Sequence, residues 1–156
     1  MREAALIEFL NDHHWTIGSV ESITGGLFAK TLTDVPGASK VFKGSLVTYS
    51  NETKMRLLSI PQETLTKYGA VSNEIGSLMA MNGKKALNVD ICVSFTGNAG
   101  PETMDQLPVG TCFIGIATAQ SQKVFRLSLA GTRNDIRKAA VEFAIGEVLK
   151  LPFASK

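Results

Sequence analysis

The segment WTIGSVESITGG, residues 15–26, changes character halfway along its length. Residues 15–20 alternate in polarity and include β-branched side chains, which predicts a strand. Thr24-Gly25-Gly26 then forms a polar, glycine-rich turn, and the apolar spacing of residues 27–32 is typical of a helix. A strand, a turn and a helix in this order begin an α/β unit, so the segment predicts a layered α/β fold.

The rest of the chain extends this alternation of strands and helices. The periodicities predict helices over residues 2–14, 27–32, 51–58, 72–86 and 133–149, a short one opened by Pro61, and strands over residues 15–20, 41–49, 91–95, 109–119 and 123–129. The last two strands are expected to form a hairpin, which makes the sheet mixed. In the helix that Ser72 caps, one face is expected to carry Ile75, Leu78, Met79, Asn82 and Ala86.

Length and composition set the broad class. The chain has 156 residues, 44% of them hydrophobic, which predicts one folded domain over residues 1–156. Its 16 basic and 14 acidic residues give a net charge of +2, too little to indicate a nucleic-acid partner. No apolar run approaches the roughly 18 residues of a membrane span, and acidic residues interrupt the apolar start, unlike in a signal peptide. We therefore expect a cytoplasmic protein with no membrane partner.

The cysteines and histidines do not predict a metal or redox site. Cys92 and Cys112 lie within apolar runs and are expected to be buried structural thiols. His13 and His14 are neighbours, so on a helix they would point about 100° apart and could not share a metal ion. A position at the C-terminal end of a helix, where partial positive charge is favoured, explains the two histidines better. We expect neither a metal nor a cofactor.

The turn after the first strand is one candidate site. Ser22 and Thr24 supply hydroxyl groups, Gly25 and Gly26 let a ligand approach the backbone, and free N–H groups at a helix start attract anions. Ser22 could attack a carbonyl group while those N–H groups hold the oxyanion. The alternative is structural: Thr24 caps the helix and the glycines pack against the sheet.

Lys54 follows the strand over residues 41–49, on the first turn of the next expected helix. If its side chain turns inward, desolvation lowers its pKa and the amine can act as a base. The alternative is an ordinary solvated lysine on a helix that Asn51 caps.

Two further segments are candidates for binding a polar ligand. The loop at residues 97–108 follows Thr96 at a strand end, where ligands bind in open α/β sheets. The final helix opens with Arg133 and Arg137, and guanidinium groups suit phosphate or carboxylate. For the loop, the structural alternative is an ordinary tight turn. For the two arginines, it is a capped helix on which both side chains are solvated.

Six segments in order resemble one known family. They are Glu21-Ser22-Ile23-Thr24-Gly25-Gly26, Val47-Thr48-Tyr49-Ser50-Asn51 with Lys54, Gly69-Ala70-Val71-Ser72, Thr96-Gly97 with Ala99-Gly100-Pro101, Pro108-Val109-Gly110-Thr111, and Gly131 with Arg133. Together they cover about residues 2–150 and resemble the CinA C-terminal domain family, also known as nicotinamide-nucleotide amidase or NMN deamidase.

The resemblance implies a stand-alone three-layer α/β/α domain that hydrolyses the carboxamide of nicotinamide mononucleotide (NMN) to the nicotinate nucleotide and ammonia. By position, it implies that Ser22 is the nucleophile, Lys54 the base and Tyr49 an assisting residue. The residues that it implies for substrate binding are Thr24, Gly25, Gly26, Thr96, Gly97 and Arg133.

Two places depart from the family pattern. Ile23 stands where cysteine is usual, and residues 102–105, Glu-Thr-Met-Asp, stand where glycines are usual. Three functions therefore stay open: an NMN amidase, an amidase for another small amide, and a catalytically silent nucleotide-binding module in competence or DNA-damage regulation. Each takes a small-molecule ligand, and a homo-oligomer is left open.

Overall fold

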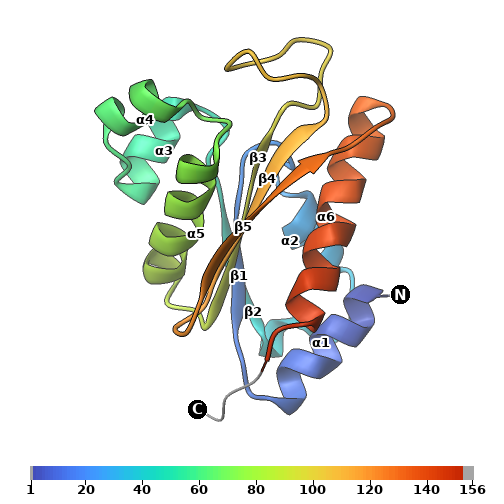
Figure 1. Ribbon diagram of the computed structural model, residues 1–156. Helices are drawn as coiled ribbons and strands as arrows, with labels where there is room; N and C mark the ends of the chain where they lie inside the picture. Colours follow the sequence, from blue (N-terminus) through green and yellow to red (C-terminus); the bar gives the residue numbers. More distant parts are fainter. Residues whose placement is uncertain (1, 153–156) are drawn as a thin grey trace.

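A computed structural model describes residues 2–152, in which five strands form one sheet with helices on both faces (Figure 1). The strand order is β2-β1-β3-β4-β5, with β1 at Ile17–Glu21, β2 at Phe42–Val47, β3 at Ile91–Gly97, β4 at Thr111–Ala117 and β5 at Gln122–Ser128. β2, β1 and β3 run parallel, whereas β4 and β5 are antiparallel to their neighbours. The predicted α/β fold with a mixed sheet is confirmed.

Two groups of helices cover the two faces of the sheet (Figure 1). On one face lie α1 (Arg2–Asp12), α2 (Leu27–Thr33) and α6 (Arg133–Leu149); on the other lie α3 (Asn51–Leu58), α4 (Gln62–Tyr68) and α5 (Asn73–Leu87). A short 3-10 helix, η1 (Ala38–Lys40), precedes β2 and was not expected. β1 begins two residues later than predicted because the Trp15 N–H still bonds to the Leu10 carbonyl at the end of α1 (2.9 Å).

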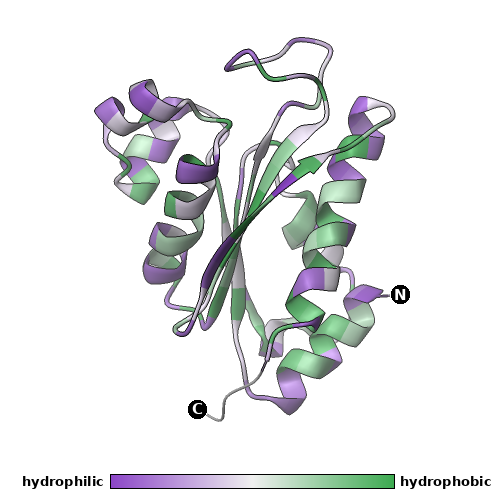
Figure 2. Cartoon of the chain, viewed as in Figure 1, coloured by the Kyte–Doolittle hydropathy of each residue, from purple (hydrophilic) through white to green (hydrophobic). Residues whose placement is uncertain are grey.

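Alternate residues of the central strands divide between two hydrophobic clusters. Ile91, Val93 and Phe95 of β3 pack with α1, α2 and α6, whereas Cys92 packs on the opposite face with Val20 and α5. Figure 2 shows hydrophilic colour on much of α4 and α5, while hydrophobic and hydrophilic segments follow one another along β5, the edge strand. Strands buried on both faces form a rigid platform, and the loops at their carboxyl ends can hold a site.

The two cysteines are buried and free, as predicted. Burial raises the pKa of each thiol to about 12, so both stay protonated near neutral pH.

Small residues on the inner face of α5 let this helix pack closely on the sheet. The buried residues of this helix are Ile75, Gly76, Met79, Ala80 and Gly83, whereas Ala86 is exposed. The expected face was therefore wrong at Ala86. A Cβ atom on Gly83 would overlap the side chains of Val20 and Cys92, so this glycine sets how closely helix and sheet approach.

We predict that Gly83→Ala destabilises the fold, since the added methyl group has no space in the packed interior. Overpacking should lower the free energy of unfolding by about 1–3 kcal/mol. Gly146→Ala on α6 is the matched control, because its Cβ would meet only the flexible end of Arg2. The control should be neutral or more stable by up to about 1 kcal/mol, from helix propensity. Urea denaturation of both variants checks this, and equal effects would contradict it.

Candidate active site

Ser22 is held at the carboxyl end of β1, which lies between β2 and β3 in the sheet. Its N–H donates to the carbonyl of Phe95 on β3 (2.9 Å), and its own carbonyl accepts from the N–H of Gly25 (3.1 Å), which closes a tight turn. Gly25 and Gly26 have φ values of 58° and 105°, a left-handed conformation that favours glycine. Ser22 is therefore fixed on both sides by backbone hydrogen bonds.

Lys54 lies on α3, just after the β2–α3 connection, and its side chain reaches Ser22. Ser50 caps α3, with a capping box to Thr53, and this orients the first turn on which Lys54 lies. The Lys54 side chain is only 1% exposed, and its Nζ donates to Ser22 Oγ (3.1 Å) and to the carbonyl of Thr48 (2.7 Å). The inward orientation of Lys54, one of two alternatives in the sequence, is the one observed.

Burial changes the acidity of Lys54. In the part of the chain that the structure describes, no carboxylate lies within ion-pair distance of its amine. Removal from water without a counter-charge disfavours the ammonium form and lowers the pKa of Lys54 to about 8. A lysine of this pKa is partly neutral near physiological pH and can accept a proton.

Glu21, the residue before Ser22, is a fully buried carboxylate that the sequence analysis did not select. Its oxygens accept from the hydroxyl groups of Ser19 (2.9 Å) and Ser45 (3.1 Å). They also accept from the backbone N–H groups of Gly26 (3.2 Å), Phe28 (2.9 Å) and Ala29 (3.1 Å) at the start of α2. Glu21 therefore ties the end of β1 to the positive end of a helix and fixes the turn that carries Ser22.

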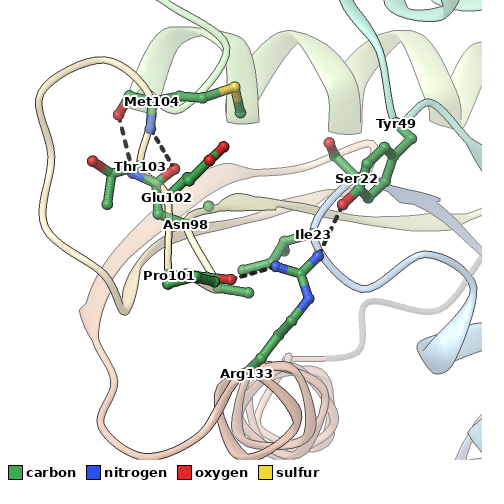
Figure 3. Close-up of a pocket in the computed structure, with 12 residues that line it drawn as sticks. Ser22, Ile23, Tyr49, Asn98, Pro101, Glu102, Thr103, Met104 and Arg133 are labelled. Carbon is green, nitrogen blue, oxygen red and sulfur yellow. Dashed lines mark hydrogen bonds between the residues drawn. The ribbon is translucent and has the colours of Figure 1, made fainter.

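A pocket of about 520 Å³ opens over Ser22 (Figure 3). Figure 3 shows Ser22, Ile23 and Tyr49 on one side of it and residues 102–104 on the other. The lining residues are Ser22, Ile23, Tyr49, Gly97, Asn98, Ala99, Gly100, Pro101, Glu102, Thr103, Met104 and Arg133. Of residues 102–105, Glu102, Thr103 and Met104 thus line the pocket, whereas Asp105 does not.

Arg133, at the first position of α6, crosses one edge of this pocket. Its guanidinium donates to the carbonyl of Gly100 (2.6 Å) and to the hydroxyl of Tyr49 (3.0 Å). Tyr49 is 60% exposed and is held by this contact at the pocket mouth. Arg133 and Tyr49, both predicted as site residues, therefore meet at the pocket although they lie 84 positions apart in the chain.

The loop between β3 and β4 is organised by one buried side chain. The amide of Asn98 donates to the carbonyls of Met104 (3.0 Å) and Leu107 (3.1 Å) and accepts from the N–H of Met104 (3.0 Å). Asp105 accepts from the N–H of Val71 (2.9 Å) and fastens the loop to the α4–α5 connection. Neither role was visible in the sequence, because both depend on contacts between distant segments.

Several predicted binding residues do not line the pocket. Thr96 is buried and donates to the carbonyl of Ala70 (2.6 Å), while Gly97 does line the pocket. The N–H groups of Gly25 and Gly26 are bonded within the chain, which leaves neither for a substrate phosphate. Thr24 is fully buried and does not cap α2, and its hydroxyl has no hydrogen-bond partner among the described residues.

Residues 2–152 contain neither a cluster of metal ligands nor a membrane-spanning helix. No group of three or more histidine, cysteine, aspartate or glutamate side chains is arranged to hold a metal ion. None of the helices described is long and apolar enough to cross a membrane.

The fold and the site together define a class: an α/β domain in which a serine at a strand end is hydrogen-bonded to a buried lysine beside a pocket. The family model described as the CinA C-terminal domain matches residues 2–151, and the chain belongs to this family. The resemblance noted in the sequence is thereby confirmed.

Individual relatives agree with this assignment. The chain is 45% identical over 150 residues to a CinA-like protein of Petrotoga mobilis, covering 96% of this chain and 37% of the relative. It is 43% identical to the MG115 homologue of Mycoplasma pneumoniae, covering 88% of both chains. The chain thus spans little more than a third of several curated relatives but most of this one.

The fold is also seen in solved structures. A CinA superfamily protein from Escherichia coli superposes with a TM-score of 0.93 at 28% identity, covering 97% of this chain and 88% of that chain. A competence/damage-inducible protein from Agrobacterium tumefaciens gives 0.88 at 28% identity, covering 96% and 94%. The three-layer arrangement is therefore shared with family members of known structure.

We predict that the stability cost of Lys54 depends on pH. The pKa is about 8 in the folded chain and 10.5 for a free lysine. The unfolded chain therefore holds the proton more tightly, and this opposes folding below pH 8. The penalty disappears as the pH rises from 8 to 10.5. At 1.36 kcal/mol per pKa unit it amounts to about 3 kcal/mol.

The test compares wild type with Lys54→Met by urea denaturation at pH 7 and pH 11. The unfolding free energy of wild type relative to the variant should rise by about 3 kcal/mol between the two. Lys85→Met, at an exposed position of α5, is the control and should show no such change. A relative stability of Lys54→Met that does not change with pH would show that the buried amine is not destabilised by its charge.

Proposed function

We propose that this chain is a serine/lysine amidohydrolase that hydrolyses the carboxamide of NMN to nicotinate mononucleotide and ammonia. The observation that carries the proposal is the 3.1 Å contact between Lys54 Nζ and Ser22 Oγ at the base of a pocket. The family to which the chain belongs includes NMN amidases, and this supports the choice of substrate.

The buried pair supplies a nucleophile and its base. Neutral Lys54 accepts the hydroxyl proton as Ser22 Oγ attacks the carboxamide carbon, and the Thr48 carbonyl keeps the amine in place. The resulting ammonium then donates a proton to the departing nitrogen, ammonia leaves, and an ester of Ser22 remains. Water then attacks this ester while Lys54 accepts a proton from it, and the resulting ammonium returns that proton to Ser22 Oγ as the acyl–oxygen bond breaks. The acid that is released ionises to the carboxylate product.

The backbone N–H group of Ile23 lies beside Ser22 in a residue that borders the pocket, and it can stabilise the oxyanion. The N–H groups of Ile23 and Thr24 donate to no acceptor among the described residues, although their neighbours on both sides are bonded. The N–H of the residue after a nucleophile is a common member of an oxyanion hole. Donors of this kind contribute several kcal/mol to the transition state.

The pocket carries charges of both signs for a zwitterionic nucleotide. Arg133 and Glu102 are its charged lining residues among those described. A guanidinium suits the phosphate or the carbonyl of the substrate, and a carboxylate suits the cationic pyridinium ring. This composition supports a nucleotide that carries a positive ring.

We predict that Ser22→Ala releases no ammonia from NMN above background, because it removes the attacking oxygen. Its stability should stay close to that of wild type, and Ser39→Ala, at an exposed position in η1, should keep full activity. A coupled ammonia assay on purified proteins makes the comparison. Full turnover by Ser22→Ala would assign the nucleophile to another residue.

A second prediction concerns pH and Lys54. Because the base must be neutral, kcat should rise with pH through an apparent pKa near 8 and then level off. Lys54→Arg should be inactive throughout, since a guanidinium does not lose its proton in this range. An active Lys54→Arg variant would mean that the residue acts only as a positive charge.

A third prediction concerns the loop that replaces the family's glycines. Changing Thr103 and Met104 to glycine, while keeping Glu102 for the pyridinium ring and Asp105 for its bond to Val71, should leave kcat/KM for NMN at least as high as in wild type. The side chains of Thr103 and Met104 line the pocket but make no hydrogen bond to Ser22 or Lys54. A collapse of kcat/KM would show that they recognise the substrate.

The catalytically silent alternative has a distinct signature. A silent nucleotide-binding module would bind NMN in calorimetry and release no ammonia at any pH between 6 and 10. The contact of Arg133 with Tyr49 and Gly100, which closes one edge of the pocket, is the observation that favours it. The ammonia assay therefore separates the two functions.

A further inference from the structure

Arg137 holds the turn that follows Ser22 from behind. It lies one helical turn after Arg133 on α6, and its side chain is half-buried. Its Nε donates to the carbonyl of Ile23 (3.1 Å) and its Nη2 to the carbonyl of Thr24 (2.8 Å). One guanidinium therefore binds two consecutive carbonyls, and Arg137 is not among the residues that line the pocket.

These bonds fix the direction of a backbone N–H group. The carbonyl of Ile23 and the N–H of Thr24 belong to the same trans peptide, so they point in opposite directions. With the carbonyl held towards α6 by Arg137, the Thr24 N–H must face away from α6. The N–H of Ile23 is fixed in the same way, because the carbonyl of its own peptide accepts from Gly25.

We infer that Arg137 is a positioning residue: by holding the turn after Ser22, it keeps the Ile23 N–H, which borders the pocket, in place as an oxyanion donor. The inference rests on the serine chemistry of the proposed function but does not depend on NMN as the substrate. Without the guanidinium, the Ile23–Thr24 peptide can rotate, which moves Ile23 and turns its N–H away from a developing oxyanion.

The arrangement suits arginine in particular. Two parallel N–H donors from a planar group match two neighbouring carbonyls, whereas a lysine ammonium is a single point of contact. Gly25 adopts the left-handed backbone that this turn requires, with φ of 58°, and a Cβ there would only touch Arg137 Nη2, at 3.5 Å. The capping box at Thr132 fixes the start of α6, so Arg133 and Arg137 project from a rigid helix, one to the pocket and one to the turn.

The experiment measures the reactivity of Ser22 without relying on a substrate. A fluorophosphonate probe is attacked by Ser22 Oγ at phosphorus, fluoride leaves, Lys54 accepts the hydroxyl proton, and the phosphoryl oxygen occupies the oxyanion position. Intact-protein mass spectrometry gives the second-order rate constant for wild type, Arg137→Met and Arg137→Lys. Lys138→Met, the adjacent exposed position of α6, is the control.

We expect Arg137→Met to react at least tenfold more slowly and Arg137→Lys at least threefold more slowly, with the control within twofold of wild type. Loss of a single oxyanion donor reduces turnover by about 10²–10³, so kcat for NMN should fall in parallel while KM changes less than threefold. A purely structural role would lower Tm and leave both rate constants of the folded protein unchanged.

Two outcomes would overturn the inference. One is a rate of phosphonylation in folded Arg137→Met within twofold of wild type. The second, which applies if Arg137→Met does not fold, is a rate of phosphonylation in Arg137→Lys equal to that of wild type. A wild-type protein whose Ser22 reacts rapidly with the probe but releases no ammonia from NMN would instead refute the proposed substrate, and the Arg137 variants would still decide the role of Arg137.

Discussion

The candidate site depends on a buried amine that lies 3.1 Å from a serine hydroxyl at the end of β1. An isolated ammonium group in a protein interior is unfavourable, and here no carboxylate compensates it among the described residues. Two oxygen atoms, from Ser22 and Thr48, are the contacts that hold Lys54 Nζ. Burial lowers the affinity of the amine for its proton, and this same penalty makes the amine a useful base.

The surrounding elements keep this arrangement in place. β1 is paired on both edges, Glu21 binds the start of α2, and the cap of α3 directs Lys54 inward. The buried polar groups at this end of the sheet are mostly satisfied by each other, so the site is rigid before any ligand arrives. Preorganisation of this kind is what stabilisation of a developing charge requires.

Much of the fold could be predicted from local sequence patterns. The helices over residues 51–58 and 133–149 lie where predicted, because each starts with a side-chain cap and has regular apolar spacing. The cap of the first is Ser50, however, and not Asn51 as expected. The inner face of α5 was predicted less well, since Gly76 and Gly83 carry no apolar side chain that a periodicity could reveal. Their role follows from how closely the helix approaches the sheet.

The candidate site, like the fold, could be predicted from the sequence only in part. Ser22 and Lys54 could be selected from their positions after strands, but only the fold shows that their side chains meet. The contacts of Glu21, Asn98 and Arg137 link backbone groups that no spacing rule connects. Thr96 and Gly25 looked like ligand-binding residues in the sequence, whereas their polar groups bond within the chain.

The most direct test of this account is the titration of Lys54 itself. Carbon-detected NMR of the lysine side chains, assigned with Lys54→Met, follows the Cε shift of Lys54 between pH 6 and pH 12. We predict a pKa of about 8 for Lys54, well below the 10.5 of a free lysine. A Lys54 that titrates near 10.5 would contradict the claim that a buried amine activates Ser22.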